Sequence, residues 1–345
     1  MTRATGEAPK APRSERVRAP TALHIPSARH QLTWRALEEK DQAQFNSLMA
    51  QARQPIEGTD IALPPYHLTI SPGPDGDPTT LAGFDQAGVL RAAAALQVWP
   101  PANDGNILTH GAVDQDWSGR GIGRSLMAWE EGRARQILSR LTGSGPVSLW
   151  AYVSQADAGR RRLLMAAGFA PARSCYWMRR DLQAPIEAAA LPEGYEWSDL
   201  NQVTSHAVMR AANQAPMTGW WTPGPIYAAL WAERWKDYRP EWSQLVIESA
   251  TGQVVAFSLV LPRTQVRAGQ DRAEALIDRF GVLPEHQGPG IGQALLARTL
   301  TTIAASSQRF VVLNVDPDRD PDGAAMAEVH GFSPAGRVIV YALEL

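Results

Sequence analysis

Three glycines at alternate positions, Gly288, Gly290 and Gly292, have the spacing with the clearest chemical meaning in this sequence. They follow a short apolar run and lead into a stretch with helical apolar periodicity, so the chain is expected to turn from a strand into a helix there. Successive main-chain N–H groups at such a turn form an anion cradle, and the helix N-terminus adds a partial positive charge. Because glycine lets the backbone adopt positive φ and approach a phosphate closely, these residues predict a phosphate or pyrophosphate site formed by main chain.

Two common nucleotide-binding motifs do not fit this turn. A Walker A loop requires GxxxxGK[ST], and no lysine follows the glycines. A dinucleotide-binding loop requires GxGxxG after the first strand of its unit, whereas the spacing here is GxGxG, far along the chain. The histidines show no HExxH spacing and the cysteine no CxxC partner, so the sequence predicts no metal site.

The glycine turn occurs a second time, and a further landmark repeats with it. Gly119, Gly121 and Gly123 align with the three later glycines, each 169 positions further along. The Gly-Phe pair that begins at Gly168 recurs at Gly331, which is 163 positions later. Two landmarks in the same order at nearly one spacing indicate a duplicated domain of about half the chain.

Each half predicts the same order of elements around its turn. A strand precedes the turn at residues 105–113 and 274–282, and a β-rich run follows the helix at 146–153 and 309–316. The helix should bury Ile122, Leu126, Trp129 and Ile137 in the first half, and Leu296, Leu300 and Ile303 in the second. A short helix ending at Gly-Phe and a closing strand complete each half, so the fold class is α/β with a mixed α+β sheet.

We place the domains at residues 31–185 and 190–345, joined by a linker with prolines near both ends. Residues 1–30 are rich in Pro, Ala, Arg and Ser, lack an apolar signal segment, and are expected to be a flexible tail.

Composition narrows the possible partners. The formal net charge is −2, which gives no support to nucleic-acid binding, and no apolar run approaches the ~18 residues of a membrane span. A single cysteine, Cys175, excludes a disulfide framework and favours a cytoplasmic location. Its strand-like surroundings predict a buried, inert thiol. We expect a monomer or homodimer.

The glycine turn resembles the [Q/R]xxGx[G/A] pyrophosphate loop of the GNAT superfamily of N-acetyltransferases, which bind acetyl-CoA. Gln287 starts the motif in the second half, whereas the first half has Ser118 where the family prefers Gln or Arg. The Gly-Phe pairs lie where the family has its own. The resemblance covers nearly the whole chain, as two tandem GNAT (acyl-CoA N-acyltransferase) domains, an arrangement similar to that of mycothiol synthases.

The resemblance implies that main-chain amides of the turns hold the acetyl-CoA pyrophosphate. Val282 and Leu283 would pair with the pantetheine arm, and Asn314 would contact it, whereas the first half has Ala151 at that place. The implied cofactor-binding residues are Val282, Leu283, Gln287, Gly288, Pro289, Gly290, Ile291, Gly292 and Asn314, with Val113, Ser118, Gly119, Arg120, Gly121, Ile122, Gly123 and Arg124 in the first half.

Acetylation of an amine needs a base to make the amine neutral and an acid to protonate the leaving thiolate. Asp278 and Glu274 precede the second turn, lie on one face of their strand, and are candidate bases or else structural carboxylates. The family's usual acid, a tyrosine four residues before the Gly of Gly-Phe, is replaced by Ala327 and Leu164. Tyr341 is the substitute we consider, with a packing role as its alternative.

The function that follows is acetyl-CoA-dependent N-acetyl transfer to a primary amine of a small molecule by direct attack. The second half is the expected catalytic domain and the first a diverged copy. The aromatic-rich stretch 213–242 either lines an acceptor pocket or forms core. The alternatives are a noncatalytic acyl-CoA-binding or sensor protein with degenerate domains, and a structural protein with empty loops.

Overall fold

The structure, a computed structural model, describes residues 13–27, 31–52, 70, 72–98, 105–142, 145–215, 217–218, 228–267 and 270–345. These residues form a mixed α/β fold that divides into two compact units. Those of unit 1 fall within Met1–Pro55, Ala62–Ala172 and Ile339–Leu345, and those of unit 2 fall within Arg173–Val338. Among the described residues, no helix is long and apolar enough to cross a membrane.

Unit 1 contains a sheet with the strand order β1-β2-β3-β4-β5-β13. Its strands are β1 (Thr33–Arg35), β2 (Thr80–Phe84), β3 (Leu90–Val98), β4 (Asn106–Val113), β5 (Ser148–Ser154) and part of β13 (Ser333–Glu344). Its helices are α1 (Arg13–Arg16), α2 (Gln42–Ala52), α3 (Ile122–Arg140) and α4 (Ala158–Ala166), with 3₁₀ turns η2 (Glu39–Asp41) and η4 (Gln115–Trp117). The first four strands are antiparallel neighbours, whereas β4 and β5 are parallel.

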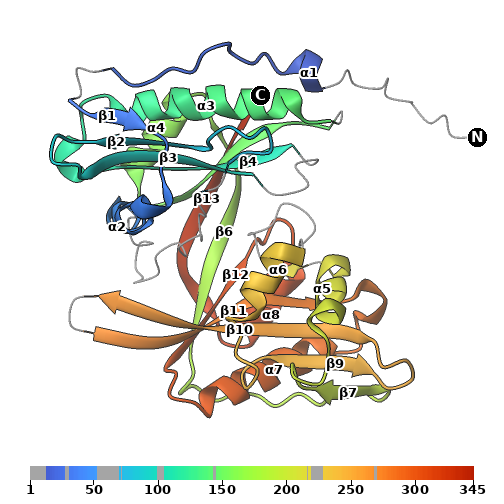
Figure 1. The fold of residues 1–345 in the computed structure, drawn as a ribbon. Helices are drawn as coiled ribbons and strands as arrows, with labels where there is room; N and C mark the ends of the chain where they lie inside the picture. Colours follow the sequence, from blue (N-terminus) through green and yellow to red (C-terminus); the bar gives the residue numbers. More distant parts are fainter. Residues whose placement is uncertain are drawn as a thin grey trace, which may run out of the picture. The chain divides into compact units, whose positions relative to one another are not determined.

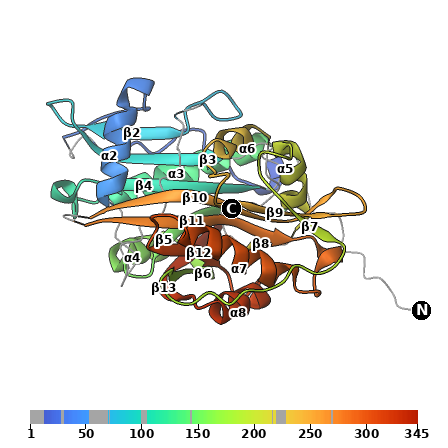
Figure 2. The same ribbon diagram turned by 90° about the horizontal axis from the view of Figure 1, so that it is seen from below.

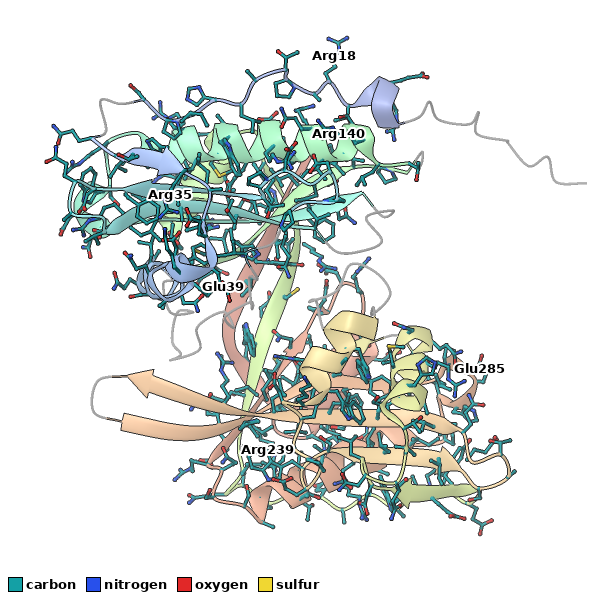
Figure 3. The ribbon with its side chains drawn as sticks, viewed as in Figure 1. Arg18, Arg35, Glu39, Arg140, Arg239 and Glu285 are labelled. Carbon is teal, nitrogen blue, oxygen red and sulfur yellow. The ribbon has the colours of Figure 1, made fainter. Side chains whose placement is uncertain are left out.

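Helix α3 covers one face of this sheet and α2 covers the other (Figure 1). The predicted face of α3 is confirmed, since Ile122, Leu126, Trp129 and Ile137 are all buried. Alternate residues of β3 serve the two faces: Ala94 packs in the α3 cluster and Ala93 in the α2 cluster, as the period of two in a strand requires. On the edge strand β1, Arg35 pairs with Asp41 and stacks on Phe84. Figure 3 labels this arginine.

Unit 2 contains strands in the order β13-β6-β12-β11-β10-β9-β7, with β8 paired to β11. They are β6 (Ala170–Asp181), β7 (Tyr195–Ser198), β8 (Met217–Thr218), β9 (Gln244–Glu248), β10 (Val254–Arg267), β11 (Gln270–Val282) and β12 (Phe310–Val315). The helices are α5 (Ser205–Gln214), α6 (Ala228–Trp235), α7 (Ile291–Ala304) and α8 (Pro321–Val329), with the 3₁₀ turn η5 (Pro284–His286).

Helix α7 packs on β9, β10 and β11, and α5 packs on β10 (Figures 1 and 2). The predicted apolar residues Leu296, Leu300 and Ile303 of α7 are buried. The repeated element order around the two turns is therefore confirmed, down to the short helices α4 and α8 that precede Gly168 and Gly331.

The two closing strands are longer than predicted, and each has residues in both units. The first three residues of β6 belong to unit 1 and the remainder, from Arg173, to unit 2. Strand β13 begins in unit 2 and passes into unit 1 at Ile339. The domain boundaries at residues 185 and 190 stay a prediction drawn from the sequence repeat. In the structure, each unit includes a strand segment from the other half of the chain.

The segment 13–27 packs on unit 1, although it lies within the stretch 1–30 expected to be a flexible tail. Val17 is buried in the α3 cluster and Leu23 packs against that cluster. Gln136 Nε2 donates to the Pro20 carbonyl over 3.0 Å, and Arg16 donates to the carbonyl of Gly145. Two apolar side chains in a polar stretch are too weak a periodic signal to predict this docking. Residues 1–12 and 28–30 lie outside the described residues.

Candidate active site

In both units two parallel strands separate at an equivalent position. The last paired residues are Leu108 with Trp150 in unit 1, and Ile277 with Leu313 in unit 2, although all four strands continue beyond them. Leu108 and Ile277 are 169 positions apart, the same spacing as the glycine turns. Each unit therefore has a fork between two strands, and one strand of each fork leads to the glycine turn.

The glycine turns have the backbone conformation that the sequence predicted. Gly119 and Gly121 have φ of 76° and 83°, and Gly288 and Gly290 have φ of 105° and 100°. At none of these four glycines does a described atom lie within 4 Å of the position a Cβ would take. Gly121 and Gly290 cap the N-termini of α3 and α7, so the turns present open main chain at helix N-termini. Figure 3 labels Glu285 in η5, just before the turn of unit 2.

A cavity of about 970 Å³ lies at the fork and turn of unit 1. Residues from β4, the turn, α3, α4 and α2 line it, among them Gly111, Val113, Ser118, Gly119, Gly121, Ile122, Gly123, Arg124, Glu130, Arg160 and Gln51. All the residues expected to bind cofactor in the first half line this cavity except Arg120. Arg120 instead stacks on Trp117, with its guanidinium 4.5 Å from the ring centre.

Glu130, a residue not singled out in the sequence, lines the same cavity. Its side chain is 1% exposed, and its Oε1 has no hydrogen-bond partner among the described residues. Burial raises its pKa to about 7, while the nearby Thr109 hydroxyl and Arg160 act in the opposite direction. Arg160 Nη1 donates to the Gly111 carbonyl over 2.7 Å. A carboxyl poised near neutral pH therefore borders the cavity beside the fork.

In unit 2, Asn314 is the first residue of β12 beyond the last parallel pair. It is buried, and neither its side-chain nitrogen nor its oxygen has a partner among the described residues. A buried amide left without partners is costly, so its presence at a fork points to an absent ligand. Leu283, which was expected to meet the pantetheine, donates its N–H to the Val255 carbonyl over 2.8 Å. Gln287, which was expected to start the pyrophosphate loop, donates from its side-chain Nε2 to the Val282 carbonyl over 3.1 Å.

Strand β8 pairs with part of the open edge of the unit 2 fork. Thr218 pairs with Phe280 and Met217 with Gly281, on the opposite side of β11 from β10. In the described part of unit 1, no strand pairs with the equivalent edge of β4. The two forks therefore differ in how much of this edge is available to a bound chain.

Asp278 lies at a β-bulge, because the pairing of β10 with β11 skips it between Ile277 and Arg279. The bulge re-aims its side chain. Arg234 Nη2 donates to its Oδ1 over 2.7 Å, and the Tyr238 hydroxyl donates to its Oδ2 over 2.7 Å. Burial by itself would raise the pKa of Asp278, but Arg234 and Arg279 outweigh burial and lower it. Asp278 is thus an ionised, hydrogen-bonded carboxylate.

The other two predicted catalytic residues have different surroundings. Glu274 is buried and forms an ion pair with Arg179. Tyr341 belongs to unit 1, where it is buried in the α3 cluster, and its hydroxyl accepts from Arg161 Nε over 3.3 Å. Sequence reasoning missed Tyr238 and Arg234 as partners of Asp278. Both lie about 40 positions earlier, and only their place in an aromatic-rich stretch marked the region.

In the aromatic-rich stretch 213–242, the aromatic side chains that the structure describes pack against one another, and Trp231 and Tyr238 are part of the core. Trp231 is buried and donates from Nε1 to the Ser205 carbonyl over 2.9 Å. Its ring lies 5.4 Å from that of Trp235 and 6.2 Å from that of Tyr238. Trp220, Trp221 and Tyr227 lie outside the described residues.

The thiol of Cys175 is buried as predicted, and burial raises its pKa to about 12, so it is not a nucleophile at neutral pH. Among the described residues, no group of three His, Cys, Asp or Glu side chains is placed to hold a metal ion.

Comparison with known proteins agrees with this architecture. Residues 208–332 match the acetyltransferase (GNAT) family. A mycothiol acetyltransferase of Actinosynnema mirum is 27% identical over 319 residues, which is 90% of this chain and 99% of the relative.

Two solved structures share the fold. A GCN5-related N-acetyltransferase from Sphaerobacter thermophilus has a TM-score of 0.63 at 22% identity, covering 91% of this chain and 96% of the other. A tandem GNAT protein from the clavulanic acid biosynthesis pathway has a TM-score of 0.62 at 19% identity, covering 91% and 98%. Family match, relatives and tandem fold together identify the chain as an acetyltransferase of the GNAT superfamily, of the tandem-domain type.

Proposed function

We propose that this acetyltransferase moves the acetyl group of acetyl-CoA to the primary amine of a small molecule, and that unit 2 carries the reaction. The observation that supports unit 2 is its fork. The first residue past the parallel pair on one strand is the unpartnered Asn314, and on the other it is the ionised Asp278. Unit 1 has Ala151 and Thr109 at these two places.

The chain's own groups fit the acyl donor. The turn from Gln287 to Gly292 offers main-chain N–H groups at the start of α7, and its positive-φ glycines leave room for a phosphate. Asn314 can donate to a carbonyl and accept from an amide N–H of a pantetheine arm. When bound, acetyl-CoA supplies a thioester carbon and a thiolate leaving group.

Asp278 and Tyr238 are the residues we assign to proton movement. The Asp278 carboxylate accepts a proton from the acceptor ammonium, directly or through water. The Tyr238 hydroxyl, which already donates to Asp278 Oδ2, can give its proton to the leaving group and recover one from Asp278. Burial raises the pKa of Tyr238, so this hydroxyl stays protonated at neutral pH. Glu274 lies opposite Phe310 in the paired stretch of β11, before the fork, and Tyr341 belongs to unit 1, so we assign neither to this relay.

A thiol-release assay across a panel of small amines, including a mycothiol-related amine, tests the proposal. We expect Asp278→Asn to lower kcat by about 100-fold or more, because an amide cannot accept the proton. KM for acetyl-CoA should change little. Tyr238→Phe should also lower kcat, because it removes the proton donor to the leaving group.

Asp181→Asn is the matched control, since this acid also lies in unit 2 and pairs with an arginine, but its side chain is 38% exposed. It should keep wild-type turnover. Wild-type turnover in Asp278→Asn would remove Asp278 from the mechanism, and the absence of turnover with every amine would remove the proposed acceptor class.

A further inference from the structure

Glu130 is a buried carboxyl in unit 1 to which the proposed reaction gives no role. It lies on α3, two turns beyond the glycine turn, and is buried beside Gly111 and Thr109 of β4. A Cβ built on Gly111 would lie 3.5 Å from Glu130 Oε1. Thr109 is the first residue past the fork, so the carboxyl borders the cavity where a chain running from the turn along β4 would end.

The second unit shows that this fold does not require an acid here. Thr299 occupies the equivalent position of α7, 169 residues later, and is fully buried. Its hydroxyl donates to the Leu295 carbonyl of its own helix over 2.8 Å, so it needs no further partner. In unit 1 the same place holds a carboxyl whose Oε1 has no partner among the described residues. The packing of this helix on its sheet therefore does not explain why a carboxyl is buried at position 130.

The charged groups around Glu130 are mostly engaged elsewhere. On α4, Arg160 donates to Gly111; on α3, Arg133 pairs with Asp75; on β4, His110 contacts Gln97. The acids that line the cavity also have partners: Asp114 pairs with Arg91, and Asp157 accepts from the N–H of Arg160.

A molecule that fills the cavity excludes water and so favours the neutral carboxyl further. A neutral carboxyl has an O–H that must donate when it is buried. Oε1 has no hydrogen-bond partner among the described residues, and the Thr109 hydroxyl beside the carboxyl stabilises its charged form, so an occupant of the cavity that accepts a hydrogen bond from the carboxyl would stabilise its neutral form. The other end of the cavity is a glycine turn at a helix N-terminus, which suits a phosphate.

We propose that Glu130 is a ligand-binding residue of the unit 1 cavity, whose carboxyl O–H donates a hydrogen bond to a carbonyl oxygen of an acyl chain that carries phosphate at its other end. Acetyl-CoA belongs to this class, so the inference rests on the proposal that acetyl-CoA is the donor. It adds that unit 1 recognises the carbonyl-bearing end of the donor through an acid that unit 2 lacks.

The test is calorimetry of acetyl-CoA binding to the full-length Gly288→Asp variant, which places a negative charge in the cradle of unit 2. Titrations at pH 7 in two buffers of different ionisation enthalpy give the protons taken up. With Glu130 present we expect uptake of about half a proton beyond that of the Glu130→Gln variant, because about half of the carboxyl is ionised before binding. Above pH 7, affinity should fall by up to about tenfold per pH unit more than it does for Glu130→Gln.

Glu130→Gln keeps a donor and should bind with nearly wild-type affinity, whereas Glu130→Leu should bind about tenfold more weakly. Equal proton uptake in the wild-type background and in Glu130→Gln would overturn the inference, as would unweakened binding by Glu130→Leu. Thermal unfolding of each variant verifies that it is folded.

Failure of acetyl-CoA to bind the Gly288→Asp protein would also overturn the inference. It would not overturn the proposed reaction, which is measured separately as amine-dependent thiol release by the wild-type protein. If the wild-type protein shows no turnover but its acetyl-CoA binding still depends on Glu130, the proposed reaction would be overturned and this inference would stand.

Discussion

Glu130 and Asp278 are two buried carboxyls that burial affects in opposite ways. Asp278 has two arginines and a tyrosine hydroxyl to stabilise its charge, so its pKa is lowered despite burial. Glu130 has only the weak influence of Thr109 and Arg160, so desolvation dominates and its pKa is raised to about 7. The same residue class therefore gives a carboxylate that is ionised at rest in one unit and an acid that titrates near neutral pH in the other.

The raised pKa of Glu130 predicts how stability depends on pH. Below the unfolded pKa of 4.5, the carboxyl is protonated in both folded and unfolded chains and costs nothing. Between pH 4.5 and about 7 only the unfolded chain loses the proton, so the free energy of unfolding falls, by about 3 kcal/mol in all. We expect Glu130→Leu to remove this loss and to be more stabilising at pH 8 than at pH 5 by about that amount.

Denaturant unfolding at the two pH values measures this difference. Glu131→Gln is the control, because Glu131 is the neighbouring acid but is more than one-third exposed and pairs with Arg135. Its effect on stability should be small and similar at both pH values. An equal effect of Glu130→Leu at pH 5 and pH 8 would contradict a buried titrating carboxyl.

At the scale of elements, the forks are the feature that turns a sheet into a binding site. Parallel pairing of β11 with β12 stops after Ile277 and Leu313, and the bulge at Asp278 bends the strand just there. In unit 1 the pairing of β3 with β4 runs without a register shift. The fork therefore does not depend on the bulge, and the bulge is what aims the acid in unit 2.

The fork of unit 2 gives a prediction for Asn314. We expect Asn314→Ala to weaken acetyl-CoA binding in unit 2 by about tenfold, since it removes hydrogen bonds to the donor. Stability without ligand should stay the same or rise, because the substitution removes a buried amide that has no partner among the described residues. Ala151 at the equivalent place of unit 1 shows that the fold accepts alanine.

Calorimetry with the Gly119→Asp protein isolates unit 2 for this measurement, and Asn314→Ala is added to that background. Unchanged affinity together with a large loss of stability would mean that the Asn314 side chain serves packing and not the donor.

At the scale of the whole molecule, the last strand links the end of the chain to unit 1. Ile339 and Tyr341 are buried in the α3 cluster, and Leu345 donates its N–H to the Val147 carbonyl. We expect a chain ending at Val338 to lose about 5 kcal/mol or more of unit 1 stability, because two large side chains leave its core. The amides of β5, which neighbours β13, should then exchange hydrogen much faster.

Hydrogen exchange with mass spectrometry reads both units in one experiment. Amides of α7 in unit 2 serve as the internal reference. Removal of Leu345 alone is the matched control, and it should have a smaller effect because it deletes one hydrogen bond and a side chain that is only partly buried. Unchanged protection of β5 in the shortened chain would contradict the place of β13 in unit 1.

The sequence by itself determined the features that depend on residues a few positions apart. Positive φ at Gly288 and Gly290 follows from the turn they form, and the buried faces of α3 and α7 follow from a helical period. The repeated spacing showed that these local features occur in two copies, each with its own glycine turn for an acyl donor.

Only the tertiary structure decided what surrounds each acid. Asp278 meets Arg234 and Tyr238, Glu274 meets Arg179, and Glu130 faces a cavity, although neither spacing nor period relates these residues. The tertiary structure also decided which unit each segment of β6 and β13 joins, because the sequence pattern of a closing strand is the same in either sheet. The physical reason is that the energy of a buried charge depends on partners brought together by folding across long stretches of chain, and a local pattern carries no record of them.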